Sequence, residues 1–312
     1  MSFAAAAPWA WIPIVLAAAL AQTVRNAAQR TLTATAGTLA ATLVRFLYGL
    51  PVAVAWLLVV RHGWDGALAG SLPPVFGSGY AAWLATGAVA QLGATAMLLM
   101  AMQQRNFIVA VTWSKTEVLQ VAAFSAVFLH ELPGAMALAA MVTATVGVVL
   151  LSRPKPGAGG TAAAGAGTRA VLYGLASGAG FALSAVGYRG AALELPGVSP
   201  WLIGAWNVVW AQLLQSLLLG GWLLWRSPAA LGVIVRAWRL SLVAGTMGAL
   251  ASIGWLTAMA LRPAADVRTL GLAEVFFSYL VSRRIFREQL TSVEKAGLLL
   301  VAAGLVGVCL QL

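Results

Sequence analysis

The chain has 312 residues, of which 61% are hydrophobic and 9% are charged, and its formal net charge is +11 at pH 7. A soluble domain has about 25% charged residues, so this composition excludes a soluble globular enzyme, a disordered tail and a coiled coil. We predict an integral membrane protein whose outer surface is solvated by lipid. We expect no nucleic-acid partner, because many arginines lie in short segments between apolar runs, where they set topology and contact lipid headgroups.

Ten apolar runs follow one another along the chain, and each is long enough for a membrane helix of about 20 residues. We therefore predict an all-α integral membrane protein with about ten transmembrane helices and short connections. The runs begin near Trp9, Gly37, Tyr80, Phe107 and Gly134 in the first half, and near Ala170, Trp201, Leu240, Val267 and Val293 in the second half.

A Pro-, Gly- and Ala-rich linker, residues 153–168, separates two five-helix units, residues 1–152 and 169–312. The units match at one constant offset of 157 residues, which pairs Glu117 with Glu274 and Gly147 with Gly304. An odd number of helices makes successive copies enter the membrane from opposite sides. We predict two inverted repeats, with a substrate site near the midplane between them.

One pattern occurs in both units: an acid opens an apolar helix, a short loop contains a glutamate, and a Gly-containing apolar helix follows. The first copy has Glu117 and Glu131, and the second has Glu274 and Glu288. This pattern and the ten runs resemble the ten-helix EamA type of the drug/metabolite transporter superfamily, although Lys115 stands where that family usually has a small or apolar residue. The resemblance implies a secondary transporter, often an exporter of metabolites, amino acids or drugs.

Polar residues in the first two runs need a partner or a water-filled cavity, because a charge at the bilayer centre costs at least about 2.5–3.5 kcal/mol. Gln22 and Arg25 share a helix face and would line a cationic cavity, or Arg25 would extend to the interface. Arg45 lies well inside the second run. It would clamp a substrate carboxylate or phosphate, or pair with Glu117 or Glu274 to hold helices together.

The fourth and ninth runs carry the two acids that the repeat relates. Trp113 and Glu117 share one helix face, and Lys115 would point elsewhere on a continuous helix or reach round through its long stem. Glu117 and Glu274 would couple transport to protons. The alternative is structural: Glu117 would pair with Lys115, Arg25 or Arg45, and both acids would anchor helix ends.

Further residues are predicted to complete the substrate site. They are polar or aromatic side chains inside the third, seventh and eighth runs: Gln91, Asn207, Trp210 and Trp255. For any single tryptophan the alternative is an interfacial or packing role.

The predicted cavity is rich in cations, with Arg25, Arg45 and Lys115 against Glu117 and Glu274. We predict a secondary active transporter, an exporter by resemblance, that moves a small anionic or zwitterionic metabolite, such as an amino acid or organic acid, by alternating access. Alternatives are a drug or cation exporter of the same superfamily, and a passive channel or scramblase. An enzyme is not expected, since no nucleophile–base or metal pattern is present.

The expected partners are the small-molecule substrate and membrane lipids. No cofactor and no metal are predicted, and a monomer is sufficient for the function. We expect a multi-pass protein of the inner (plasma) membrane. The loop charges place both termini outside, whereas the family resemblance implies both termini inside.

Overall fold

A computed structural model describes residues 8–62, 74–102, 113–151, 164–277 and 291–310. These ranges are helical and contain no strand. The helices are α1 (Trp11–Leu47), α2 (Leu50–His62), α3 (Ser78–Met102), α5 (Glu117–Phe128), α6 (Ala135–Leu151), α7 (Ala164–Leu193), α8 (Pro200–Arg226), α9 (Pro228–Arg236), α10 (Trp238–Leu261), α11 (Ala264–Leu270), the 3-10 helix η1 (Gly271–Ala273) and α13 (Ser292–Cys309).

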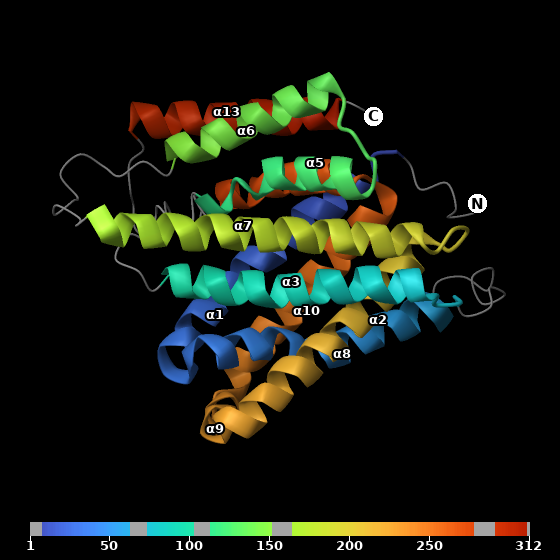
Figure 1. Ribbon diagram of the computed structural model, residues 1–312, viewed down its shortest axis with the longest axis vertical. Helices are drawn as coiled ribbons and strands as arrows, with labels where there is room; N and C mark the ends of the chain where they lie inside the picture. Colours follow the sequence, from blue (N-terminus) through green and yellow to red (C-terminus); the bar gives the residue numbers. More distant parts are fainter. Residues whose placement is uncertain (1–7, 63–73, 103–112, 152–163, 278–290, 311–312) are drawn as a thin grey trace.

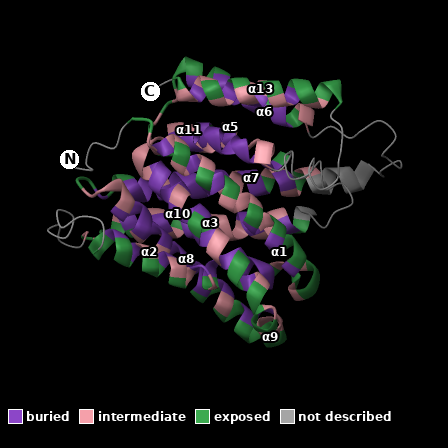
Figure 2. Cartoon of the chain, turned by 180° about the vertical axis from the view of Figure 1, so that it is seen from behind, coloured by how far each residue is buried: buried purple, intermediate pink, exposed green. Residues whose placement is uncertain are grey.

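Six helical stretches in the described ranges are long and apolar enough to cross a membrane. They are Trp11–His62, Ser78–Met100, Val171–Leu193, Pro200–Arg226, Trp238–Leu261 and Ser292–Cys309, and α5 and α6 are shorter apolar helices. Large apolar side chains such as Leu217, Trp225 and Leu299 are exposed on the outside, and Figure 2 shows the buried residues gathered in the interior. Soluble monomers rarely expose so much apolar surface. The prediction of an all-α, membrane-embedded protein is confirmed.

Most described helices begin near the start of a predicted run, but the run predicted from near Gly37 is divided between α1 and α2, and α9 was not predicted. α11 begins at Ala264, before the predicted start near Val267, and α7 begins at Ala164, inside the predicted linker. Alanine-rich sequence accounts for both extensions, because alanine has the highest helix propensity. The start predicted near Phe107, linker residues 153–163 and Glu288 lie outside the described residues.

Gly37 interrupts α1 with φ +79° and ψ 168°, a conformation that glycine adopts without steric cost. The chain changes direction there, near the start predicted for the second run. Gln29 is buried just before the bend, and its Nε2 donates a 2.8 Å hydrogen bond to the Ala41 carbonyl just after it. This side chain therefore fixes the two arms of α1 against each other.

The helices pack in long pairs, and Figure 1 shows α6 with α13 and α3 with α7 lying across the view. α6 runs along α13, α3 along α7, and α1 along α10, while α2 lies on α8. Small residues stand at these contacts: a Cβ added to Gly187 of α7 would lie 2.7 Å from the backbone nitrogen of Gly87 in α3. Such residues let helix backbones approach closely in a membrane, where packing rather than the hydrophobic effect drives association.

Candidate functional site

A small polar cavity of about 30 Å³ lies where α1, α10, α5 and the α11–η1 segment meet. Five of the predicted site residues line it, and Glu117 and Glu274 are both among them. The lining residues are Gln22, Lys115, Glu117, Val118, Trp255, Arg268, Gly271, Leu272 and Glu274. The cavity joins parts of the chain that are far apart in sequence, and it has room for about one water molecule.

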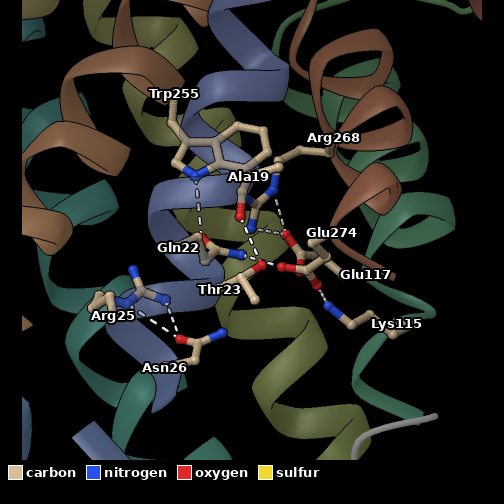
Figure 3. Close-up of polar contacts among 10 residues, drawn as sticks. All are labelled: Ala19, Gln22, Thr23, Arg25, Asn26, Lys115, Glu117, Trp255, Arg268 and Glu274. Carbon is tan, nitrogen blue, oxygen red and sulfur yellow. Dashed lines mark hydrogen bonds and ion pairs between the residues drawn. The ribbon is translucent and has the colours of Figure 1, made fainter. Parts of the chain in front are cut away.

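Glu274 is the centre of a chain of polar contacts (Figure 3). Gln22 Nε2 donates a 2.6 Å hydrogen bond to Glu274 Oε2, and Lys115 forms an ion pair with Oε1 of the same carboxylate. Trp255 Nε1 donates to Gln22 Oε1 over 3.1 Å. Both amide ends of Gln22 are therefore used, so its orientation is fixed between the indole and the carboxylate.

Glu117 forms an ion pair with Arg268 and not with any of the cations proposed for it above. The Arg268 guanidinium also lies over the rings of Trp255, at 5.1 Å, and Phe181, at 5.9 Å. Arg268 is not among the site residues predicted from the sequence. The one signal for Arg268 in the sequence is that a charged residue stands inside an apolar run. Its pairing with Glu117 leaves no local pattern, because the two residues are more than a hundred residues apart.

Both acids stand directly after an interruption of helical structure. Glu117 opens α5 after a turn at Lys115 and Thr116, and Glu274 follows the 3-10 turn Gly271–Ala273. The turn at Lys115 explains why this side chain does not point away from the site, as a continuous helix would require. Glu117 pairs with Arg268, which is near Glu274 in the sequence, and Glu274 pairs with Lys115, which is near Glu117. The two ion pairs therefore link the start of α5 to the α11–η1 segment twice.

Arg25 and Arg45 lie beside this cavity and are almost completely buried, with 4% and 2% of their surface exposed. Arg25 donates from Nη2 to Asn26 Oδ1 at 2.6 Å, and Arg45 donates from Nη1 to Thr95 Oγ1 at 3.3 Å. In Figure 3 Arg25 lies beside Asn26, apart from the Lys115–Glu274 pair. Within the described ranges neither arginine has an acidic partner, so the predicted pairing of Arg45 with Glu117 or Glu274 is not formed.

The other predicted site residues lie outside the cavity wall. Gln91 accepts hydrogen bonds from Tyr188 and Gln215, both at 2.9 Å, in a partly buried network between α3, α7 and α8. Asn207 is buried and accepts a 2.8 Å hydrogen bond from Tyr80.

Two tryptophans that were assigned to the site are partly exposed. Trp210 stacks on Trp206 with 37% of its surface exposed, and Trp113 is 41% exposed. An aromatic ring at a helix surface fits an interfacial or packing role, the alternative stated for single tryptophans.

A further ion pair lies between Arg189 of α7 and Glu131 in the loop after α5. Arg189 Nη2 and Nε donate to Glu131 Oε1 at 2.7 Å and 3.0 Å, and Nη1 donates to the Met259 carbonyl at 2.9 Å. The guanidinium thus ties the α5–α6 connection to the end of α10. The loop glutamate of the repeated pattern has a structural contact in this first copy.

The charges of the cavity balance: Lys115 and Arg268 face Glu274 and Glu117. Arg25 and Arg45 add two positive charges next to it. No group of three or more His, Cys, Asp or Glu side chains stands together in the described ranges, which therefore offer no such set of metal ligands.

Comparison with solved structures supports the fold. One chain, described only as the crystal structure of a protein, superimposes with a TM-score of 0.68 at 16% sequence identity, over 97% of each chain. No protein-family model matches the sequence, and no curated protein matches it. Fold and site together define a helical membrane protein with a largely shielded ionic cluster between its helices.

Proposed function

We propose that this protein is a secondary active transporter, an exporter by its resemblance to the EamA type, which moves a small anionic or zwitterionic metabolite by alternating access. The observation that carries the proposal is the double ion pair around a small polar cavity between apolar helices. Charged groups are costly inside a membrane and mark substrate or ion pathways when they are retained.

The helix packing supports ten spans in two inverted repeats. If residues 8–151 and 164–310 each contribute five spans, α1 corresponds to α7, α3 to α10, and α6 to α13. The long pair α1–α10 then corresponds to the long pair α7–α3, and α6–α13 corresponds to itself. A two-fold axis in the membrane plane produces this arrangement.

The contact between α6 and α13 supports the same symmetry at the level of single residues. A Cβ on Gly147 would meet the backbone of Gly297 and Val301, and one on Gly304 would meet Ala140 and Ala144. Under the offset of 157 residues, Gly147 becomes Gly304, and Ala140 and Ala144 become Gly297 and Val301. The two glycine contacts are therefore copies of each other.

The site also suggests how charge movement would be coupled to transport. Glu274 holds Lys115 and Gln22 together. A proton on the Glu274 carboxyl would remove its charge, weaken the contact with Lys115 and leave that ammonium free for a substrate carboxylate. Interrupted helices at Glu117 and Glu274 give such a site the local freedom found in transporter helices that break near the midplane.

We expect Glu274→Gln to abolish proton-coupled uptake and to retain exchange of substrate between the two sides of the membrane, because glutamine keeps the hydrogen bond with Gln22 but cannot titrate. The probe would be the strongest stabiliser in a thermal-shift screen of amino acids, organic acids and phosphorylated metabolites, since a ligand stabilises only the folded form. Counterflow and pH-driven uptake of that labelled compound would be measured in proteoliposomes.

Glu194→Gln is the matched control, because this acid is exposed and lies outside the cavity. It is expected to behave as the wild type in both assays. If Glu274→Gln retains full pH-driven uptake, Glu274 does not take part in proton coupling. Uptake that does not saturate and shows no counterflow would indicate that the protein is a channel and not a carrier.

A further inference from the structure

Arg25 and Arg45 form a buried pair of like charges at the contact between α1 and α10. Their stems converge on Gly248: a Cβ at that position would lie 3.0 Å from Arg45 Cγ and 3.3 Å from Arg25 Cδ. Only a residue without a side chain leaves room for both stems there. The two guanidinium groups thus belong to one site, built from the two arms of α1 and the middle of α10.

This pair keeps hydrogen-bond donors without partners. Arg25 Nη1 and Arg45 Nε are fully buried and bond to no group in the described ranges. Gln212 of α8 lies against Gly49, next to the Arg45 carbonyl, and both its amide atoms are buried without partners as well. Buried donors are nearly always satisfied in proteins, so unpaired donors on two adjacent cations indicate a place for an anion.

Charge balance specifies what kind of anion fits. The neighbouring pairs Lys115–Glu274 and Arg268–Glu117 are neutral as sets, which leaves two uncompensated positive charges on Arg25 and Arg45. An amino acid zwitterion would leave both charges uncompensated, and a monocarboxylate would leave one. A group with two negative charges cancels them, and guanidinium groups bind oxyanions through paired N–H donors.

We propose that Arg25 and Arg45 bind a doubly charged oxyanion, of the phosphate or sulfate class, between α1 and α10. This inference rests on the proposed transport function for its biological role and narrows the substrate to compounds that carry such a group. The same chemistry occurs in a free phosphorylated metabolite and in the phosphate headgroup of a lipid, and the experiment below separates these sources.

The test is equilibrium binding to purified, detergent-solubilised full-length protein, with inorganic phosphate and sulfate as probes. Acetate, glycine and chloride at matched ionic strength are the comparison ligands. Phosphate and sulfate are expected to raise the melting temperature in a saturable manner, and the comparison ligands are not. Stabilisation by acetate or glycine equal to that by phosphate would overturn the proposal, as would no stabilisation by either dianion.

Variants distinguish a binding role from a structural one. Arg25→Gln and Arg45→Gln are each expected to weaken phosphate binding at least about tenfold. Without phosphate, both variants are expected to melt at a higher temperature than the wild type, because each relieves the repulsion between two buried cations. Arg239→Gln, at an exposed arginine, is expected to change neither quantity. Unchanged phosphate affinity in both buried-arginine variants would refute the assignment.

Gly248→Ala tests the geometry while both charges stay in place. The added methyl group would displace the arginine stems, so phosphate binding is expected to weaken without any gain in the melting temperature of the ligand-free protein. Wild-type phosphate affinity in this variant would contradict a site at Gly248.

Nanodiscs separate the two sources of the oxyanion. If phosphatidic acid in a phosphatidylcholine disc stabilises the protein and competes with labelled phosphate, a lipid headgroup reaches the site; if it does not compete, the ligand is a free anion. Both results support the dianion site. If the protein binds phosphate but exchanges no substrate across the membrane of proteoliposomes, the anion site is supported and the proposed carrier function is refuted. If it exchanges a zwitterion but does not bind phosphate, the anion site is refuted and the carrier function is not.

Discussion

Arg268→Ala is expected to lower the free energy of unfolding by about 3–5 kcal/mol, because it leaves the largely shielded carboxylate of Glu117 without its cation. Glu117 and Arg268 join α5 to α11, and both side chains are mostly shielded. The guanidinium also covers the Trp255 ring, so its removal takes away packing as well as charge. Thermal unfolding in detergent and urea titration would measure the loss.

The double variant Glu117→Gln with Arg268→Gln separates the unpaired charge from the lost contact. It is expected to recover most of the stability, because neither side chain then buries a charge. Arg239→Ala, at an exposed arginine, is the control and is expected to unfold like the wild type. A wild-type stability of Arg268→Ala would show that the pair is not formed in the folded protein.

Gly147→Ala and Gly304→Ala are expected to destabilise the protein by similar amounts, about 1–3 kcal/mol each, by overpacking the contact between α6 and α13. The new Cβ would lie 2.6 Å from the Gly297 carbonyl oxygen in one case and 2.6 Å from the Ala140 carbonyl oxygen in the other. A backbone atom cannot rotate away, so the helices must separate. Urea unfolding of each variant measures the cost.

The double glycine variant is expected to cost less than the sum of the two single ones, because the first substitution already separates the shared interface. Gly221→Ala in α8 is the control: its Cβ would meet nothing within 4 Å, and alanine favours a helix. Very different costs at Gly147 and Gly304 would argue against the two-fold relation between α6 and α13.

Much of the fold follows from the sequence because hydrophobic runs in a membrane must form helices that satisfy their own backbone hydrogen bonds. The runs near Trp201 and Leu240 became α8 and α10 almost unchanged. What composition does not show is where a helix breaks. The turn at Lys115 and the 3-10 turn before Glu274 depend on packing between distant segments.

For the site, too, the sequence predicts which residues take part but not how distant segments bring them into contact. Gln22, Lys115, Glu117, Trp255 and Glu274 were selected because each is polar or aromatic inside an apolar run, and the fold brings them together. Their pairing was not predictable, since spacing relates only residues on one helix. Arg268 is the clearest case: it meets Glu117 through the fold and not through any local pattern.

The central claim, a site that opens to each side of the membrane in turn, is tested most directly by two-sided cysteine labelling. The chain has one cysteine, so Cys309→Ser gives a background in which Leu272→Cys marks the cavity wall and Leu217→Cys marks the outer surface of α8. A membrane-impermeant maleimide would be added to the outside or the inside of vesicles. We predict labelling of Leu272→Cys from either side, no labelling of Leu217→Cys, and vesicles that hold a membrane potential throughout. Labelling of Leu272→Cys from one side only, from neither side, or together with loss of the potential would contradict the account.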